Sequence, residues 1–476
     1  MSTPARVVIV GAGPAGVRAA QTLVAAGLRP LVLDENARCG GQIYRQPPAD
    51  AGFERTARER YGFEARQAGA LHAAMAAVLP HIDYRPDTLA WACEAGELHT
   101  VGARGAERLP FTHLIVASGA TDRVLPVPGW TLPGVYTLGA AQVALKAQGC
   151  AIGRRVAFAG SGPLLYLVAY QYARAGARVI AVLDSNSLRQ QAAAVPWLLR
   201  QPTLLAKGLY YMGWLRAHGV AVMHDAVLRG IEGMHSVETL RWVPRSRLGD
   251  GAAVRTLSCD ALGLSFGLRP ETQLADLAGC QFAFDETSRT WLPLRDTEGR
   301  SSVPGVYLAG DGAGIAGADA AERGGRRAAL ALLADLGMRP LGAPTRAALA
   351  RAQSRSMAFR YGIERAFAVD PGMASHWPDE MTVCRCEEIC AGTLRRCIRE
   401  DGVGELNRLK AMTRVGMGRC QGRMCAEAAA RLLAHESGAD LAAVGRLRAQ
   451  APLKPIALSA LLDGSLAVAT QGPHDE

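Results

Sequence analysis

Four cysteines near the C-terminus stand in two close pairs. One residue separates Cys384 from Cys386, and four residues separate Cys420 from Cys425, with a stretch of helical pattern between the pairs. Two close pairs of thiols at such spacing are typical of a four-thiolate site, which holds either zinc or a [2Fe–2S] cluster. We therefore predict that these four residues are ligands of a metal centre.

The remaining cysteines form no close pair of the kind that disulfide reductases use. They are isolated in the sequence or lie between the two ligand pairs: Cys39, Cys93, Cys150, Cys259, Cys280, Cys390 and Cys397. Free cysteine packs as a small hydrophobic side chain, so we expect a structural role for most of them. Thiol–disulfide exchange is therefore not the predicted chemistry.

A second chemical motif lies near the N-terminus. Residues 6–10, RVVIV, predict a buried strand, and GAGPAG follows at 11–16. A helical pattern then ends at Gly27, and a second strand leads to Asp34. This strand–glycine–helix–strand order, with an acid about 20 residues after the glycines, is typical of a dinucleotide-binding unit.

Each glycine of this motif has a mechanical role. Gly11 permits the tight turn, Gly13 lets the backbone approach a pyrophosphate, and Gly16 lets the helix pack closely on the strand. The free N–H groups at the helix start favour phosphates, and the acid is placed to bind a ribose hydroxyl. The predicted cofactor-binding residues of this unit are Gly11, Ala12, Gly13, Pro14, Ala15, Gly16, Asp34 and Glu35.

Three later segments favour FAD as the dinucleotide. They are CGGQIYRQ at 39–46, a strand with a small-residue turn at 113–129, and GVYLAGDGAG at 305–314. In this order the motifs resemble the pyridine nucleotide–disulfide reductases, over residues 5–335. In that family the late Gly–Asp pair holds the ribityl chain and the flavin pyrophosphate. The resemblance adds these residues to the predicted flavin site: Gly41, Gln42, Ala117, Gly119, Gly310 and Asp311.

A second strand–glycine–helix–strand unit spans residues 154–186, where the resembled family binds NAD(P)H. Leu165 replaces the third glycine, and we place Leu183 at the position equivalent to the first unit's acid, with Asp184 following. Two interpretations stay open, a working NAD(P) site and a nucleotide fold without its ligand. The predicted cofactor-binding residues here are Gly160 and Gly162.

A helical insertion at 188–216 is rich in large aromatic residues. These side chains either fill a local core or contact another subunit, because tryptophan and tyrosine are enriched at interfaces. The aromatic residues are Trp197, Tyr210, Tyr211 and Trp214.

The upstream flavin motifs favour the cluster over zinc, because a flavin takes two electrons while an iron–sulfur cluster passes them singly. The stretch CRCEE…GMGRCQGRMC resembles the [2Fe–2S] module of the bacterioferritin-associated ferredoxin type. That module ends the large subunit of heteromeric amino-acid and opine dehydrogenases: octopine and nopaline oxidases, hydrogen cyanide synthase, and the hydroxyproline and proline dehydrogenase complexes. Sarcosine oxidase has a related large subunit. With all its motifs in order, the chain resembles this family from end to end.

The resemblance implies an electron-transfer subunit with FAD and [2Fe–2S], in a dehydrogenase that oxidises an amino acid, imino acid or opine at its C–N bond. Substrate oxidation would take place on a second flavoprotein subunit of the glycine- or sarcosine-oxidase type. Further options are FMN at a subunit interface and a small ferredoxin-like subunit. We identify no catalytic residues in this chain. The alternatives are a self-sufficient NAD(P)H:acceptor flavin oxidoreductase and a non-catalytic assembly or electron-relay subunit.

The predicted fold class is α/β, with two Rossmann-like three-layer dinucleotide-binding domains of the glutathione-reductase type and a small, mainly helical Fe–S module. The predicted domains are an FAD-binding domain at 1–125 and 271–336, an NAD-binding-like domain at 126–270, a linker and helix at 337–380, and a BFD-like [2Fe–2S] domain at 381–476.

Composition excludes several other classes. Of 476 residues, 49% are hydrophobic and 20% charged, which is typical of a globular protein. The net charge of +10 is spread along the chain and comes almost wholly from arginine, so nucleic acid is not a predicted partner.

No run of about 18 apolar residues predicts a membrane span. The start MSTPARVVIVGAG lacks a signal-peptide pattern, so we expect a cytoplasmic location, with peripheral attachment to the inner membrane as an option.

Overall fold

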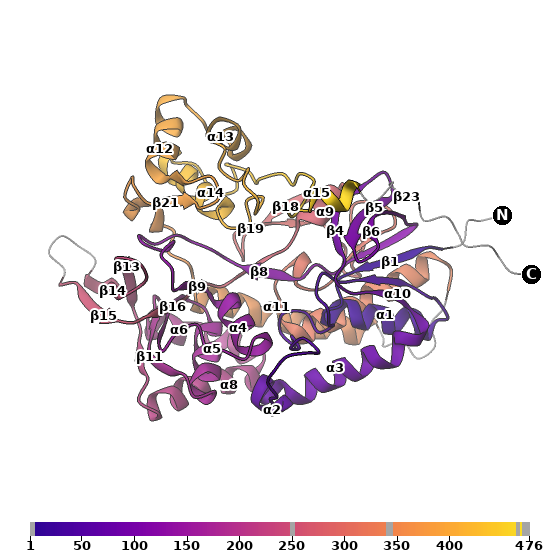
Figure 1. The fold of residues 1–476 in the computed structure, drawn as a ribbon, viewed down its shortest axis with the longest axis horizontal. Coiled ribbons are helices and arrows are strands. Elements are labelled where there is room, and N and C mark those ends of the chain that lie inside the picture. The colour runs from indigo at the N-terminus through magenta and orange to yellow at the C-terminus, as the bar shows by residue number, and fades with distance from the viewer. Residues whose placement is uncertain (1–4, 248–252, 339–345, 463–466, 469–476) are drawn as a thin grey trace, which may run out of the picture.

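The chain folds into two parallel-sheet units and a helical C-terminal unit (Figure 1). The computed structural model describes residues 5–247, 253–338, 346–462 and 467–468. The predicted α/β class, with two Rossmann-like three-layer units and a mainly helical module, is confirmed. Among the described residues, no helix combines the length and the apolar character needed to cross a membrane.

The first unit is built on a parallel sheet with the strand order β20-β7-β1-β2-β3. Its strands other than the edge strand β3 are almost continuously buried, because both faces of the sheet are covered. Ile9 packs into the core under the helices, and Val8 packs into the core under an antiparallel sheet. The strands are Val7–Val10 (β1), Leu31–Leu33 (β2), Asp83–Arg85 (β3), His113–Val116 (β7) and Val306–Leu308 (β20).

Helices and an antiparallel sheet form the outer layers of this unit. The helices are Pro14–Ala25 (α1), Ala65–Val78 (α3) and Ala318–Asp335 (α10). The antiparallel sheet contains Leu89–Glu94 (β4), Glu97–Gly102 (β5) and Gly105–Pro110 (β6), and Ala467–Val468 (β23) pairs in parallel with β6.

The second unit repeats this plan with the parallel order β12-β11-β10-β16-β9. Its strands are Val135–Thr137 (β9), Arg155–Ser161 (β10), Arg178–Asp184 (β11), Ala221–Met223 (β12) and Ala261–Phe266 (β16). Its helices are Leu138–Ala147 (α4), Pro163–Arg174 (α5) and Pro202–Ala217 (α8). The other layer is an antiparallel sheet of Ala226–Glu232 (β13), Thr239–Pro244 (β14) and Arg255–Ser258 (β15).

Two short antiparallel strands carry the chain between the units. They are Ala120–Asp122 (β8), which leads out of the first unit, and Leu268–Pro270 (β17), which returns from the second. Asp122 also fixes the start of α4, because both of its carboxylate oxygens accept the N–H of Gly139 at 3.1 Å. Figure 1 shows β8 crossing the middle of the molecule.

The C-terminal unit consists of a small hairpin and a group of helices, seen in the upper part of Figure 1. The hairpin is Thr382–Cys384 (β21) with Ile389–Cys390 (β22), and the helices are Ala391–Glu400 (α12), Leu406–Thr413 (α13) and Ala426–Ser437 (α14). Its core is continuous with one core of the second unit. Buried Trp130 crosses the junction and donates its Nε1–H to the Thr382 oxygen at 2.7 Å. The unit is therefore packed onto the rest of the chain.

Candidate functional site

The first glycine loop joins β1 to α1 and has no room for a side chain at two positions. Gly11 has a φ of +105°, and a Cβ there would lie 2.4 Å from the oxygen of Ala117. A Cβ on Gly16 would lie 1.7 Å from the Gly11 oxygen. The protein itself therefore requires both glycines. A Cβ on Gly13 would meet no protein atom closer than 3.6 Å, so its absence leaves space for a ligand.

The other predicted flavin motifs converge on this loop. Gly41, with a φ of +62°, would place a Cβ 3.1 Å from the Cα of Gly13, so the Gly41–Gln42 turn lies against the glycine loop. Gly310, with a φ of +69°, would place a Cβ 2.9 Å from the Cβ of Ala15 on α1. The structure thus brings together segments that follow β1, β2, β7 and β20.

Asp34 is the acid that faces the glycine loop. It is buried, and its Oδ2 accepts the N–H of Ala12 at 2.6 Å, while Oδ1 accepts the N–H of Asn36 at 2.8 Å. Burial raises the pKa of Asp34, although the N–H groups of Asn36 and Ala12 oppose the increase. Glu35 is exposed and forms an ion pair with Lys454 instead.

Asp311 is held at the start of α10. It lies in the short turn Gly310–Ala313 (η4), and its Oδ1 accepts the N–H groups of Ala316 at 3.0 Å and Gly317 at 3.3 Å. Burial raises the pKa of Asp311. Across from this turn, Gly119 adopts a φ of +75°. The late Gly–Asp pair therefore borders the same site, and the hydrogen bonds of Asp311 fix its position.

The arrangement fits a flavin dinucleotide. Space is left at Gly13, and two buried polar atoms beside the predicted flavin turns, Arg45 Nε and Thr121 Oγ1, have no hydrogen-bond partner among the described residues. Such orphaned atoms are rare in proteins unless a ligand or water satisfies them. The N–H groups at the start of α1 suit a pyrophosphate.

The second glycine loop has the same backbone plan, with one correction to our prediction. Gly160 stands opposite Asp184, one residue past Leu183. Gly160 corresponds to Gly11, since both lie at the carboxyl end of a central strand with positive φ and would drive a Cβ into a neighbouring carbonyl oxygen. Asp184 binds the N–H two residues further on, as Asp34 does. The equivalent of Asp34 is therefore Asp184, and the placement of Leu183 is wrong.

Both oxygens of the Asp184 carboxylate accept hydrogen bonds from other residues of the chain. Asp184 is 0% exposed. Its Oδ2 accepts the hydroxyl of Tyr166 at 2.5 Å and the amide of Gln191 at 2.7 Å, and its Oδ1 accepts the N–H of Asn186 at 2.9 Å. A ribose hydroxyl would find no free oxygen there.

A later segment of the chain, residues 365–370, closes this second loop, and we call it the cap segment. It begins in the last turn of the helix Arg346–Ala366 (α11) and continues beyond it. Ser161, between the two loop glycines, donates its hydroxyl to the Phe367 oxygen at 2.8 Å. The Phe367 ring lies against that of Tyr166, with centroids 6.4 Å apart. Arg245 binds the Asp370 carboxylate at 2.9 Å. The cap segment thus contacts both the glycine loop and the residue that binds Asp184.

The four predicted metal ligands lie on two segments that meet. Cys384 ends β21, Cys386 follows in the hairpin turn, and Cys420 and Cys425 belong to the loop before α14, which we call the ligand loop (residues 420–425). The four thiols are close enough to influence one another's pKa values: Cys425 interacts with both Cys384 and Cys420, and Cys420 interacts with Cys386. Among the described residues, no group of three or more His, Cys, Asp or Glu side chains is arranged as a site for a metal ion.

The pKa values of the ligand thiols shift in opposite directions: burial raises the pKa of Cys386, the interactions with Cys384 and Cys420 raise the pKa of Cys425, and the pKa values of Cys384 and Cys420 are lowered. A hydrogen bond from Cys425 is the largest cause of both decreases, and it lowers the pKa of Cys384 to about 6 and that of Cys420 to about 5. Backbone N–H groups add to this, from Gly416 to Cys384 and from Gly422 to Cys420. Both glycines have positive φ, which aims these N–H groups at sulfur. Thiolate character and N–H donors at sulfur suit an iron–sulfur cluster.

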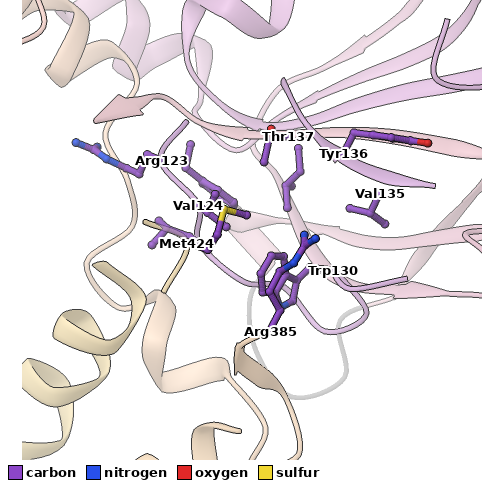
Figure 2. A pocket seen from close by; sticks show the side chains of 11 residues that line it. Arg123, Val124, Trp130, Val135, Tyr136, Thr137, Arg385 and Met424 are labelled. Carbon is purple, nitrogen blue, oxygen red and sulfur yellow. The ribbon is translucent and has the colours of Figure 1, made fainter. Parts of the chain in front are cut away.

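A pocket adjoins the ligand loop, between the second unit and the C-terminal unit. Figure 2 shows Trp130, Arg385 and Met424 around it, and the last two are sequence neighbours of predicted ligands. Its other lining residues are Arg123, Val124, Leu125, Val135, Tyr136, Thr137, Leu264 and Phe266. These described lining residues include no carboxylate, histidine or lysine. They offer no acid–base pair for oxidation of a C–N bond.

The helical insertion has a buried part and an exposed part, and its contact with another subunit stays a prediction. Tyr211 is buried, and Trp197 packs on Tyr361 of α11. Other apolar side chains remain exposed, and we call them the α8 surface: Phe63, Leu204, Leu209 and Tyr210, which are 47%, 37%, 55% and 45% exposed. The Phe63 and Tyr210 rings meet edge to face at 5.2 Å.

Two family descriptions match the chain. A pyridine nucleotide-disulphide oxidoreductase model matches residues 5–340, and a BFD-like [2Fe-2S] binding domain model matches residues 382–435. These matches support FAD and a [2Fe–2S] cluster as the cofactors. They agree with the two sites described above.

Relatives with the same organisation are named as components of larger enzymes. The chain is 38% identical to an opine oxidase subunit of Agrobacterium tumefaciens, over 95% of this chain and 90% of the relative. It is 34% identical to hydrogen cyanide synthase subunit HcnB of Pseudomonas aeruginosa, over 96% and 98%. The fold is similar to that of L-proline dehydrogenase from P. horikoshii, with a TM-score of 0.68 at 19% identity over 96% of this chain and 79% of that one.

Gly13→Val tests the flavin site. The purified variant should retain about a tenth or less of the wild-type FAD, because the side chain enters the space left for the pyrophosphate. Flavin absorbance per chain measures this, and circular dichroism should show an intact fold, because the nearest protein atom to a Cβ is 3.6 Å away. Full FAD retention would contradict the assignment.

Cys420→Ser tests the metal site. The anaerobically prepared wild type should contain two irons per chain and, after dithionite reduction, give the rhombic paramagnetic resonance signal of a reduced [2Fe–2S] cluster. The variant should lose that signal, whereas Cys397→Ser, at a buried helical position in α12, should keep it. One zinc and no such signal in the wild type would refute the cluster ligands.

Proposed function

Because the chain belongs to the pyridine nucleotide-disulphide oxidoreductase family and also carries a BFD-like [2Fe-2S] binding domain, we propose that it is the electron-transfer subunit of a heteromeric dehydrogenase. The substrate class is an amino acid, imino acid or opine that is oxidised at its C–N bond. Support comes from relatives named as opine oxidase and hydrogen cyanide synthase subunits, which match nearly the whole chain.

The observation that carries the proposal is the contact of the ligand loop with β17 and with the residues that follow β17 into the first dinucleotide unit. Gln273 donates its amide to the Gln421 oxygen at 2.8 Å, and Arg269 donates to the Arg423 oxygen at 3.1 Å. Both acceptors lie between Cys420 and Cys425. A chain that holds a flavin and a cluster in adjoining parts is suited to convert two-electron oxidation into single-electron steps.

The residues of this chain contribute binding and positioning. The glycine loop and the turn at Gly41 would hold the dinucleotide, with Asp34 and Asp311 fixing its ribose and ribityl hydroxyls. When bound, FAD supplies the capacity to accept two electrons and release them singly. The pocket beside the ligand loop has no acid–base pair, which supports substrate oxidation on a partner flavoprotein of the glycine- or sarcosine-oxidase type.

The alternative of a self-sufficient NAD(P)H oxidoreductase needs a working second site. Three observations oppose it: Leu165 is buried at the third glycine position, Asp184 has no free oxygen, and the cap segment binds Ser161. We propose that the second unit keeps the dinucleotide fold but binds no nicotinamide nucleotide.

NADH titration distinguishes these two functions. In anaerobic solution, NADH should leave the flavin of the purified chain oxidised, or should reduce the flavin far more slowly than dithionite does. The flavin absorbance measures this. Ser161→Ala should not create NADH activity, because Asp184 stays engaged by Tyr166. Rapid stoichiometric bleaching by micromolar NADH would overturn the proposal and favour the alternative.

The α8 surface should contact the partner flavoprotein, because exposed apolar patches mark interaction sites. The chain alone should show little amino-acid or opine dehydrogenase activity. In the complex, Leu209→Asp should weaken binding between the two proteins by about tenfold or more, measured by analytical ultracentrifugation. Met234→Asp is the control, since Met234 is 81% exposed on the turn between β13 and β14. The proposed contact would be contradicted if Leu209→Asp and Met234→Asp weakened binding equally. Robust turnover of a substrate by the chain alone would contradict the need for a partner.

A further inference from the structure

Glu271 and Arg423 form an ion pair between the first dinucleotide unit and the ligand loop. Arg423 Nε donates to Glu271 Oε2 at 2.8 Å, and the Arg423 and Glu271 side chains are only 13% and 12% exposed. We propose that this pair sets the distance and orientation between the bound flavin and the bound cluster, so that both are positioning residues for electron transfer. The inference rests on the proposed function, since it requires electrons to pass between the two cofactors.

Glu271 is tied by its backbone to a predicted flavin turn. Its N–H donates to the Gly119 oxygen at 3.0 Å, and its carbonyl oxygen accepts the Ser118 hydroxyl at 2.6 Å. The turn that carries Asp311 packs on the same atoms: a Cβ on Gly312 would lie 2.6 Å from Ser118 Oγ and 3.4 Å from the Glu271 oxygen. A shift of Glu271 would therefore disturb the flavin turns.

Arg423 is tied equally closely to the cluster ligands. It lies in the ligand loop between Cys420 and Cys425, and its Nη1 donates to the Cys420 oxygen at 3.4 Å and to the Leu453 oxygen. The guanidinium thus bridges a ligand's backbone and the Glu271 carboxylate. One ion pair connects the predicted flavin turns to a cluster ligand.

The opposite charges of Glu271 and Arg423 favour a fixed distance between the two side chains. Burial raises the pKa of Glu271, but the charge and hydrogen bond of Arg423, together with the charge of Arg269 and the N–H of Gln273, outweigh burial, so the pKa lies below its usual value. Both partners are therefore charged. A largely buried pair contributes little net stability compared with apolar packing, but each partner requires the other in place. This behaviour suits a contact that specifies position.

Other contacts hold the C-terminal unit in place without this pair. Arg446 binds both carboxylate oxygens of Asp276, at 2.6 and 2.7 Å, and Trp130 binds the Thr382 oxygen. Loss of the Glu271–Arg423 pair should therefore move the ligand loop without detaching the unit.

The step that the pair would position moves one electron from reduced flavin to the oxidised cluster. One ferric iron becomes ferrous, and no covalent bond forms or breaks. The second electron follows after a one-electron acceptor has reoxidised the cluster, and the flavin releases its proton to solvent.

The test is flash photoreduction of the anaerobic chain loaded with FAD and cluster. A deazaflavin flash reduces the flavin, and the absorbance of the cluster then follows intramolecular transfer. At matched driving force, Glu271→Gln and Arg423→Gln should each slow this first-order step about tenfold or more, with FAD content and iron content unchanged. The double variant should be no slower than either single one. Arg395→Gln is the control, because Arg395 pairs with Glu436 inside the C-terminal unit and should leave the rate unchanged.

Unchanged rates in both variants would overturn the inference. So would loss of FAD or iron from both, since that would assign the pair to folding of the ligand loop, and so would equal slowing in the Arg395 control. The measurement needs neither substrate nor partner, so an incorrect substrate class or partner assignment would leave its result intact.

Discussion

Close approach of backbone segments, at positions where any side chain would collide, is the constraint on which the organisation of this chain depends. A Cβ on Gly16 would lie 1.7 Å from the Gly11 oxygen, and one on Gly325 of α10 would lie 1.9 Å from the Ala15 oxygen of α1. These contacts bring the two helices that border the flavin site together. A Cβ on Gly418 would lie 2.3 Å from that of Cys386, so the same device operates beside the cluster ligands. Small residues thus bring cofactor-binding segments within reach of one another.

The two dinucleotide units share a backbone plan but differ in what occupies the glycine loop. In the first unit Gly13 leaves space that no protein atom fills, and Asp34 faces that space. In the second unit the Tyr166 hydroxyl donates to the Asp184 carboxylate, and the Phe367 oxygen of the cap segment accepts the hydroxyl of Ser161 in the glycine loop. The second unit thus contacts the chain between α11 and the C-terminal unit.

Local motifs were predictable from the sequence, whereas long-range contacts were not. The roles of Gly11 and Gly16 follow from residues that are close in the chain, and the fold class follows from the order of such motifs. The position of Asp184 was missed by one residue because the pairing of β10 with β11 shifts register between Val156 and Ala157, which leaves Ile180 as an extra residue before the acid, and the sequence pattern does not reveal such an irregularity. The cap segment and Glu271 were missed because their partners lie 206 and 152 residues away. The domain boundaries and the individual site residues stay predictions.

Freeze-quench paramagnetic resonance of the native complex tests the central claim most directly. The chain, isolated anaerobically with its partner flavoprotein, would be mixed with a panel of amino acids and opines and frozen at successive times. The account predicts that one of these substrates gives the reduced [2Fe–2S] signal within the time of a single turnover, and that NADH does not. Reduction of the cluster by NADH in the chain alone, or complete flavin reduction by substrate while the cluster stays oxidised, would contradict it.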